Sequence, residues 1–365
     1  MNQTATGPDR IAAELAADLD AGFAAIFEAH QNVLFSTALR ICGRWADAED
    51  LTATAFLRAF RALSGYDRER IAALRTRPWL LTILLNAWRN QVRTAARQPR
   101  EVLDAEPPEA EARGASVEAQ AERHETSREL AAMAVPAPGR LLDKVAARWT
   151  RVPGPAGDVY VATTDLGVAY LRTAGTAEEF AGLFRARFGR PLLPASRPPA
   201  GLLTALRTGR AGRIPLDLCD LTPFAASVLA AAMTIPRGET RPYGWIARQA
   251  GRPRAVRAAA SALAANPVPL LIPCHRIVQA DGAAGGYVFG SPRKEALLRH
   301  EGANLDEVRD LAAAGTRYLA SDTTGVVCFP SCRNARRITP LHRRGFASLA
   351  AAGRSGFRPC LHCQP

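Results

Sequence analysis

Large apolar residues recur every three or four positions over residues 20–95, which is the spacing of one face of an α-helix. Within this region Asp47 is placed to cap one helix, and Pro78 suits the first turn of the next. We therefore predict an all-α helical domain over residues 1–96.

The pattern changes over residues 97–140, where acidic residues, proline and alanine replace large apolar side chains. We predict a linker there. Two short β-rich runs in residues 157–173 flank a glycine-containing turn, which indicates a β-hairpin. A helix near 177–187 and a proline-rich loop over 191–199 complete a predicted α/β subdomain over residues 141–216.

Two short helices are predicted over residues 243–250 and 254–264, with a glycine- and proline-containing turn between them. Two helices joined by a tight turn form a helix-turn-helix, and the small residues of the second would permit close approach to a duplex. This pattern lies in a predicted subdomain over residues 217–303. A linker over 304–317 and a small α+β domain over 318–365 would follow, so we predict a multidomain chain.

Composition adds charge to this picture. The 365-residue chain carries a formal net charge of +13, with a pI of about 10.2. This balance favours a polyanionic partner, because each neutralised phosphate releases counterions, although basic proteins of other kinds are common. The N-terminus has no secretion signal and no apolar run reaches about 18 residues, so we expect a cytoplasmic protein with no membrane partner. Seven cysteines in such a protein indicate thiols and metal ligands rather than disulfides.

The candidate nucleophile is Cys274, in the run Pro273-Cys274-His275-Arg276. An imidazole and a guanidinium beside a thiol favour the thiolate, which is the reactive form. The neighbouring prolines restrict the backbone and would hold the sulfur in place. A Cys-His pair by itself is a coincidence in many proteins. Cys219 has no comparable neighbours and is expected to be a core thiol.

A longer ordered string makes the assignment specific. Residues 157–302 resemble the O6-alkylguanine-DNA alkyltransferases, also called methylated-DNA–protein-cysteine methyltransferases. The segments that carry the match are Thr222-Pro223-Phe224, the run from Ile235 to Tyr243, the helix-turn-helix, Asn266, the nucleophile run and His300-Glu301-Gly302. The resemblance implies single-use transfer of an alkyl group from O6-alkylguanine in double-stranded DNA to a cysteine, with O4-alkylthymine as a candidate second substrate.

The resemblance also implies roles for the residues around the nucleophile. Cys274 would accept the alkyl group, His275 would take its proton through a water, and Glu301 would orient His275. Asn266 would brace the turn around the nucleophile. Tyr243 would donate a proton or a hydrogen bond to the leaving guanine.

The expected DNA contacts follow from the position of the lesion. It lies inside the base stack, so the cysteine reaches it only if the base is flipped out of the duplex. By resemblance, Arg257 on the second helix of the helix-turn-helix would fill the space that the base leaves. Further expected DNA contacts are Arg254, Ala258 and Arg276, and the expected lining of the base pocket is Tyr287, Gly286 and Pro269. Val288 stands where some family members have a hydroxyl near the guanine oxygen, so the tolerance for bulkier alkyl groups is left open.

The C-terminal segment contains two close pairs of thiols, Cys328 and Cys332 in a C-x3-C spacing and Cys360 and Cys363 in a C-x2-C spacing. Two such pairs provide the four thiolates of a tetrahedral zinc site, which would stabilise a domain too small to bury a large core. We therefore predict one zinc ion as the cofactor. Two histidines could replace a cysteine as ligands, although four cysteines suffice: His342 and His362.

The residues around these cysteines, in the runs 323–328 and 356–360, resemble the zinc domain of the bacterial adaptive-response alkyltransferase. In that family the domain repairs methyl phosphotriesters, which implies that Cys328 is a second methyl acceptor; a purely structural zinc module is the alternative. The family's zinc domain is normally N-terminal and followed by a helical DNA-binding domain, whereas here it comes last and without that domain. Arginines of the segment could hold phosphates instead: Arg333, Arg336, Arg337, Arg343 and Arg344.

Residues 21–94 resemble region 2 of the extracytoplasmic-function sigma factors, through the runs 46–60 and 77–86. In sigma factors this module binds RNA polymerase and captures unpaired promoter bases, which stack on aromatic side chains. A plain helical bundle is the alternative, and residues 97–140 are too polar to hold a second sigma helix-turn-helix. Beside DNA repair, the second hypothesis is an alkylation-responsive transcriptional regulator in which methylation of Cys328 alters DNA binding.

Overall fold

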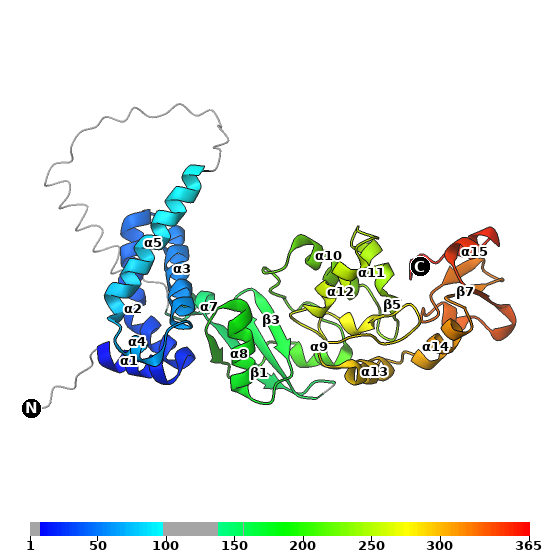
Figure 1. The fold of residues 1–365 in the computed structure, drawn as a ribbon, viewed down its shortest axis with the longest axis horizontal. Coiled ribbons are helices and arrows are strands. Elements are labelled where there is room, and N and C mark those ends of the chain that lie inside the picture. The colour runs from blue at the N-terminus through cyan, green and yellow to red at the C-terminus, as the bar shows by residue number, and fades with distance from the viewer. Residues whose placement is uncertain (1–7, 98–137, 156) are drawn as a thin grey trace, which may run out of the picture. The chain divides into compact units, whose positions relative to one another are not determined.

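The computed structural model describes residues 8–97, 138–155 and 157–365, and helices make up its N-terminal end (Figure 1). The predicted linker over residues 97–140 falls almost entirely outside the described residues. Helix α7 (Pro138–Val145) begins inside the predicted range.

Contacts divide the chain into two compact units. Unit 1 extends to Arg148 and also contains Ala181–Pro194, whereas unit 2 comprises Trp149–Phe180 and Ala195–Pro365. The predicted α/β subdomain over residues 141–216 therefore contributes to both units and does not form a compact unit by itself.

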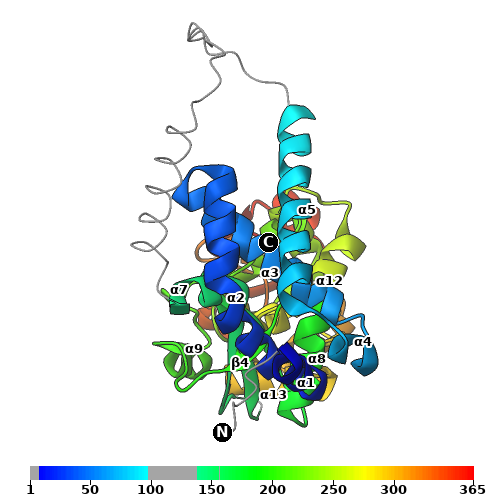
Figure 2. The same cartoon turned by 90° about the vertical axis from the view of Figure 1, so that its left-hand side faces the viewer.

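Unit 1 is a bundle of helices, which agrees with the predicted helical N-terminal domain. Helices α2, α3 and α5 run side by side and bury apolar residues where they meet (Figures 1 and 2). Phe23 contacts Phe56 and Phe60 edge to face, with ring centroids 6.1 and 5.1 Å apart. The elements in unit 1 are α1 (Pro8–Ala17), α2 (Leu19–Cys42), α3 (Trp45–Leu63), α4 (Arg68–Ala72), α5 (Thr76–Arg97), α7 and β4 (Leu192–Pro194).

Local sequence sets the ends of these helices. Asp18 caps α2 by accepting hydrogen bonds from two backbone N–H groups, and Gly43 ends the helix in the left-handed conformation at φ +70°. The prediction that Asp47 caps the next helix is wrong. It lies inside the first turn of α3, where its carboxylate accepts a hydrogen bond from Arg44 at 2.6 Å, so its charge favours the helix without capping it.

The N-terminal part of unit 2 contains the predicted β-hairpin, in which β2 (Val159–Thr164) pairs antiparallel with β3 (Gly167–Arg172). Other elements here, some of which extend into unit 1, are β1 (Ala147–Val152), α8 (Ala177–Phe188) and α9 (Leu202–Thr208). The predicted loop over 191–199 is corrected in part, because strand β4 lies within it.

The structure confirms the helix-turn-helix. Helices α11 (Tyr243–Gln249) and α12 (Val256–Ala264) are joined through Gly251, whose φ is +74°. The preceding helix, α10 (Pro223–Met233), is capped by the hydroxyl of Thr222.

The run with the candidate nucleophile forms a short 3-10 turn, η1 (Cys274–Arg276), which leads into β6 (Ile277–Val278). Strand β6 pairs in parallel with β5 (Arg241–Pro242), immediately before α11. Helix α13 (Ser291–His300) follows and ends at Glu301. The pairing of β5 with β6 thus brings the start of the helix-turn-helix next to the nucleophile.

The predicted linker over residues 304–317 is corrected, because most of it is helix α14 (Leu305–Ala313). Asn304 caps this helix by accepting from the backbone N–H of Glu307 at 3.1 Å. Leu305 is buried with apolar residues of α13 and β6, so the segment packs within unit 2.

The C-terminal segment is a small sheet with the strand order β10-β8-β7-β9 and one flanking helix, α15, among its described elements. Its elements are β7 (Tyr318–Ser321), β8 (Val326–Cys328), η2 (Ala335–Arg337), η3 (Pro340–His342), β9 (Arg343–Phe346), α15 (Leu349–Arg354) and β10 (Arg358–Pro359). This mixture agrees with the predicted α+β class.

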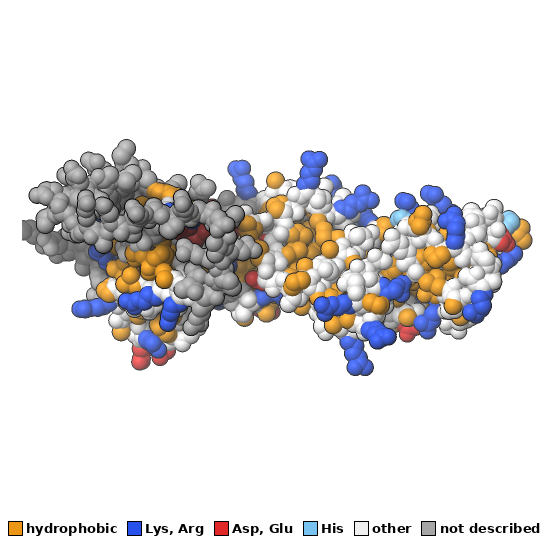
Figure 3. All heavy atoms as spheres, turned by 90° about the horizontal axis from the view of Figure 1, so that it is seen from above, with side chains coloured by type: hydrophobic (Ala, Val, Ile, Leu, Met, Phe, Trp, Pro, Cys, Tyr) orange, Lys and Arg blue, Asp and Glu red, His pale blue; other side chains and the backbone are white. Residues whose placement is uncertain are grey.

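Basic side chains stand out over the face in Figure 3, on which acidic ones are few. This distribution accords with the net charge of +13. None of the helices in the described residues combines the length and apolar character that a membrane crossing needs.

Candidate active site and metal centre

Asn266 contacts the candidate nucleophile, Cys274. The thiol residue is only 5% exposed, and the amide Nδ2 of Asn266 lies 3.2 Å from its sulfur. The same amide donates to Ile272 O, and its Oδ1 accepts from Val268 N–H, both at 3.0 Å. The turn that Asn266 spans contains Leu270 at φ +74°, a conformation that a leucine adopts only when its surroundings impose it.

Glu301 binds both His275 and Arg276, which follow the nucleophile. Its Oε1 lies 3.1 Å from His275 Nε2 and accepts from the guanidinium of Arg276 at 2.7 Å, while Oε2 accepts from Arg276 Nε at 2.8 Å. Arg276 also donates to Ile235 O and Gly209 O. Because Arg276 is 3% exposed and its donors face these acceptors, the prediction that it contacts DNA is corrected. It anchors Glu301 instead.

Burial and hydrogen bonding set the protonation states of Glu301 and His275. Burial acts to raise the pKa of Glu301, but hydrogen bonds from His275 and Arg276 lower it to about 2, so the carboxylate stays charged. Burial lowers the pKa of His275, which keeps the imidazole neutral and able to accept a proton. Its Nδ1 is buried without a partner among the described residues, so the nitrogen opposite Glu301 is free to act.

Two cations that the sequence reasoning missed lie near the nucleophile. Burial raises the pKa of the Cys274 thiol, whereas the Asn266 hydrogen bond, Lys294 and Arg172 lower it. Burial lowers the pKa of Lys294 to about 8. Arg172 donates to the carbonyl oxygens of Asn266 and Pro267 and so ties β3 to the nucleophile turn. Lys294 could have been found from spacing, because it shares a helix face with the buried leucines of α13 and with Glu301.

Two tyrosines that were expected to face the base, Tyr287 and Tyr243, lie close to this centre. Tyr287 packs edge to face on the ring of His275 at 6.0 Å, and its hydroxyl is buried without a partner among the described residues. Tyr243 is half-buried, and burial and nearby Cys274 raise its pKa, so its phenol keeps its proton. The Nζ of Lys294 lies 5.8 Å from the ring centroid of Tyr243. Of the other predicted lining residues, Gly286 is exposed and Pro269 is buried.

The predicted DNA-facing residues of the helix-turn-helix are all exposed: Arg254, Arg257 and Ala258. Arg254 precedes α12, whereas Arg257 and Ala258 lie in its first turn. The opposite face of the helix buries Ala259 and Leu263. The helix thus presents a basic and small-residue face outward, as a helix that enters a DNA groove requires.

The C-terminal cysteines form the predicted cluster. Cys328, Cys332, Cys360 and Cys363 are buried, and their sulfur atoms all lie within 4.8 Å of one another. Hydrogen bonds from the neighbouring thiols and from backbone N–H groups of the Asn334 turn lower the pKa of Cys332. Four clustered thiolates fit one tetrahedral zinc ion.

The two histidines considered as ligands have other partners. His362 Nε2 lies 3.0 Å from Glu239, and His342 Nδ1 lies 2.8 Å from Asp322. Three of the arginines proposed to hold phosphates are also engaged within the protein: Arg336 with backbone carbonyls, Arg343 with Glu307, and Arg344 with Asp322. Cys219 is exposed, so the expectation of a core thiol there is wrong.

Three family models match separate segments of the chain. Residues 26–98 match Sigma-70 region 2, residues 223–303 match the DNA binding domain of 6-O-methylguanine DNA methyltransferase, and residues 306–365 match the metal binding domain of Ada. These matches identify the class of each part. Three successive parts of the chain are thus similar to a sigma-70 region 2 domain, to the DNA-binding domain of the methylguanine methyltransferases and to the metal-binding domain of Ada.

Individual relatives match shorter stretches. The bifunctional transcriptional activator/DNA repair enzyme Ada of Escherichia coli is 50% identical over 91 residues, which are 25% of each chain. A methylated-DNA–protein-cysteine methyltransferase of Shigella flexneri is 42% identical over 111 residues, covering 28% of this chain and 64% of that protein. The chain thus spans less than two thirds of the length of these relatives. The crystal structure of Mycobacterium tuberculosis OGT in complex with DNA is 33% identical and covers 46% of this chain and 99% of that one, with a TM-score of 0.36.

Proposed function

We propose that the chain repairs alkylated DNA by transferring an alkyl group from O6-alkylguanine to Cys274. The observation that carries this proposal is the arrangement of a buried thiol, a neutral histidine with a free Nδ1 and a charged Glu301 behind that histidine. This is the nucleophile, base and orienting group of a triad, and the histidine and carboxylate roles follow those seen in other triads.

The transfer step forms one S–C bond and breaks one C–O bond. His275 receives the thiol proton of Cys274 through a water, the sulfur attacks the alkyl carbon, and the electron pair of the broken bond stays with the guanine. The guanine then takes up one proton, with the phenol of Tyr243 as the donor. The product is a thioether, which is stable to hydrolysis, so each molecule acts once.

We propose double-stranded DNA as the substrate and the cytoplasm as the location. Arg257, exposed in the first turn of α12, would fill the gap left by the flipped base, with Arg254 and Ala258 beside it. Tyr287, Gly286 and Pro269 would line the pocket. O4-alkylthymine is the candidate second substrate.

The C-terminal domain is proposed to repair methyl phosphotriesters at Cys328. The four thiols are positioned for one zinc ion, which would keep them as thiolates at neutral pH. Arg337 and Arg358 line the cavity that leads to Cys328, which suits a substrate on the DNA backbone. A neutral triester is attacked more readily than a charged phosphodiester, which repels a thiolate.

A second candidate function is transcriptional regulation that responds to alkylation. The match of residues 26–98 to sigma-70 region 2 favours it, with RNA polymerase as the partner. In this proposal, methylation of Cys328 changes DNA binding, and the N-terminal domain contacts polymerase. We also propose that the chain is divided into a sigma-like domain, a two-part alkyltransferase and a zinc domain.

Mass spectrometry after exposure to methylated DNA tests both acceptors. With duplex DNA carrying O6-methylguanine we expect one methyl group on the peptide with Cys274, and none in Cys274→Ala. With DNA carrying methyl phosphotriesters we expect the gain on the peptide with Cys328. Transfer that persists in Cys274→Ala would refute the main proposal.

The regulatory proposal is tested by binding measurements before and after phosphotriester treatment. Tighter binding to promoter DNA that is lost in Cys328→Ala would support it. Equal binding of the methylated and unmethylated protein would leave repair as the function.

A further inference from the structure

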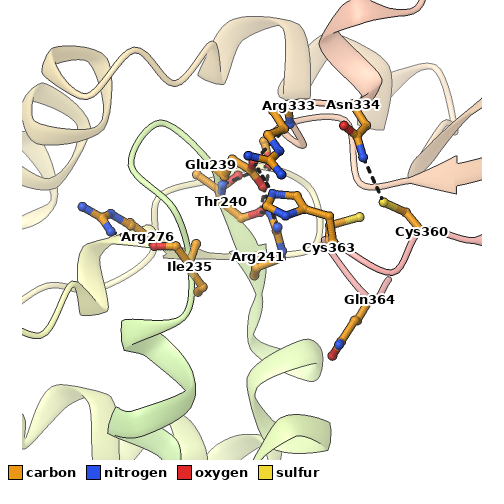
Figure 4. Close-up of polar contacts among 12 residues, drawn as sticks. Ile235, Glu239, Thr240, Arg241, Arg276, Arg333, Asn334, Cys360, Cys363 and Gln364 are labelled. Atoms are coloured by element: carbon orange, nitrogen blue, oxygen red, sulfur yellow. Dashed lines mark hydrogen bonds and ion pairs between the residues drawn. The ribbon is translucent and has the colours of Figure 1, made fainter. Parts of the chain in front are cut away.

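The metal-binding domain is docked onto the segment that leads into the helix-turn-helix. This bridging segment, residues 238–245, contains Glu239, strand β5 and Tyr243. Both cysteine pairs of the metal centre lie in loops that contact it, and all of these residues belong to unit 2. Figure 4 shows Glu239 and Thr240 facing Arg333, with the turn of Cys360 and Cys363 beside them.

Glu239 is the centre of the contact. It is 1% exposed, and its Oε1 accepts from the backbone N–H of Arg333 at 3.1 Å and lies 3.0 Å from His362 Nε2. Its Oε2 accepts from Arg241 at 2.6 Å. Arg333 follows the first pair of cysteines and His362 lies between the second, so one carboxylate holds both metal-binding loops.

Two further contacts fasten the same loops to the bridging segment. The hydroxyl of Ser331 accepts from Thr240 N–H at 3.0 Å and donates to Thr240 O at 2.8 Å. The indole N–H of Trp245 donates to the carbonyl oxygens of Cys363 and Gln364, at 3.1 and 2.9 Å. The metal-binding loops therefore contact the segment at its start and at its end.

The other side of the bridging segment contacts the alkyl-acceptor site. Strand β5 pairs with β6, which directly follows the nucleophile turn. A Cβ at Gly238 would lie 2.7 Å from the carbonyl oxygen of Glu301, so the backbones approach closely. Arg336 of the metal-binding domain donates to Gly238 O and Gly302 O, on either side of this approach. Tyr243, expected to face the guanine, lies in the same segment.

Burial makes these contacts depend on one another. Glu239 and Arg241 are each 1% exposed, and a buried carboxylate is stable only while its hydrogen-bond partners are in place. Without a metal ion the two cysteine loops would lose the constraint that orders them. Glu239 would then lose Arg333 and His362 as partners, and the bridging segment would lose its fixed position.

We propose that Glu239 and Ser331 are positioning residues that couple the metal centre to the Cys274 site, so that zinc occupancy controls the order of residues 238–245 and, through them, the rate of alkyl transfer. The coupling is reciprocal, because a metal that favours one conformation of the segment is itself held more tightly by that conformation. The expected effect on the rate of alkyl transfer rests on the proposed function, whereas the expected effect on the order of residues 238–245 does not.

Hydrogen exchange of the full chain, with zinc bound and after removal by a chelator, tests the coupling of order. We expect faster exchange at the amides of residues 238–245 and 277–278 after removal, in addition to residues 318–365, with helices α2 and α3 unchanged. An increase confined to residues 318–365 would overturn the proposal.

Release of zinc to a coloured chelator tests the two positioning residues. We expect Glu239→Gln to release zinc about tenfold faster and Ser331→Ala severalfold faster, because each loses hydrogen bonds that hold a cysteine loop. Asp322→Asn is the matched control, since Asp322 also binds a histidine and an arginine but within the metal-binding domain, at a more exposed site. It should change the rate less than about twofold. Equal rates in Glu239→Gln and Asp322→Asn would refute the coupling.

The rate of methyl transfer to Cys274 provides the last measurement. We expect Ser331→Ala, which leaves the buried ion pair intact, to lower this rate severalfold with zinc bound and zinc removal to lower it further. If Cys274 accepts no methyl group under any condition, the proposed function fails, and the exchange and release measurements still decide the coupling. A transfer rate that is independent of zinc and of Ser331 would overturn the statement about rate.

Discussion

The amide nitrogen of Asn266 lies 3.2 Å from the sulfur of Cys274, and the same side chain ties both ends of the nucleophile turn together. Asn266→Ala would leave buried backbone groups unpaired and remove the hydrogen bonds that hold the turn containing Leu270. We expect the free energy of unfolding to fall by about 3 kcal/mol in urea denaturation. Asn304→Ala removes a more exposed asparagine that only caps α14, and it should cost about 1 kcal/mol. Similar losses in the two variants would contradict the role given to Asn266.

Glu301 should make stability depend on pH in the acid range. Its pKa is about 2 in the folded protein, below the ordinary value of 4.5, so it stabilises the fold by about 3 kcal/mol above pH 4.5. That contribution is lost as the pH falls from about 4.5 toward 2. The difference in unfolding free energy between the native protein and Glu301→Gln should therefore shrink over this range.

Denaturant titrations at several pH values measure that difference. Glu295→Gln is the control, because Glu295 binds Arg309 at a partly exposed site. A Glu301→Gln difference that stays constant from pH 7 to pH 3 would show that the carboxylate is not held in its charged form.

Lys294 should assist ionisation of Cys274 only while it carries its own charge. Lys294→Met removes a cation that lowers the pKa of the thiol, and we expect transfer to slow about tenfold at pH 7. Because the pKa of Lys294 is about 8, its charge is lost as the pH rises above that value, and the two proteins should then converge. Rates measured from pH 6.5 to 9.5, with the exposed Arg293→Met as the control, test this. A constant ratio across the range would exclude the electrostatic role.

Arg257 should matter only when a base must leave a duplex. Arg257→Ala is expected to slow transfer from O6-methylguanine in duplex DNA by about 10- to 100-fold, since flipping costs a few kcal/mol. Transfer from the free base should be unchanged, because no gap in a duplex needs filling. An equal loss with both substrates would place Arg257 in the base pocket instead.

Sequence order predicted the local features of the site well. The helix-turn-helix and the hairpin follow from local residue patterns, whereas the pairing of His275 with Glu301 was implied by the family resemblance. The four cysteines could be grouped because a metal site needs its ligands at short and regular intervals. The pattern also placed the helices of the N-terminal domain, although not the cap of α3.

Contacts between distant segments could not be predicted in this way. Arg276 was expected among the DNA contacts, yet Ile235 and Gly209 supply buried acceptors from far along the chain. Glu239 is a charged residue in a polar stretch, and only the packing of unit 2 reveals that it is buried. The helix in the expected linker over 304–317 forms because Leu305 finds an apolar cluster, which local composition does not reveal.

The bridging segment also limits how this protein can be engineered. Laboratory selection for a roomier alkyl pocket would naturally mutate residues near Tyr243, yet β5 lies between that tyrosine and Glu239. Substitutions that widen the pocket by moving the backbone would loosen the cysteine loops as well. Libraries that spare residues 238–242 and vary residues around Val288, which is exposed and outside that segment, should yield new substrate ranges with fewer misfolded clones.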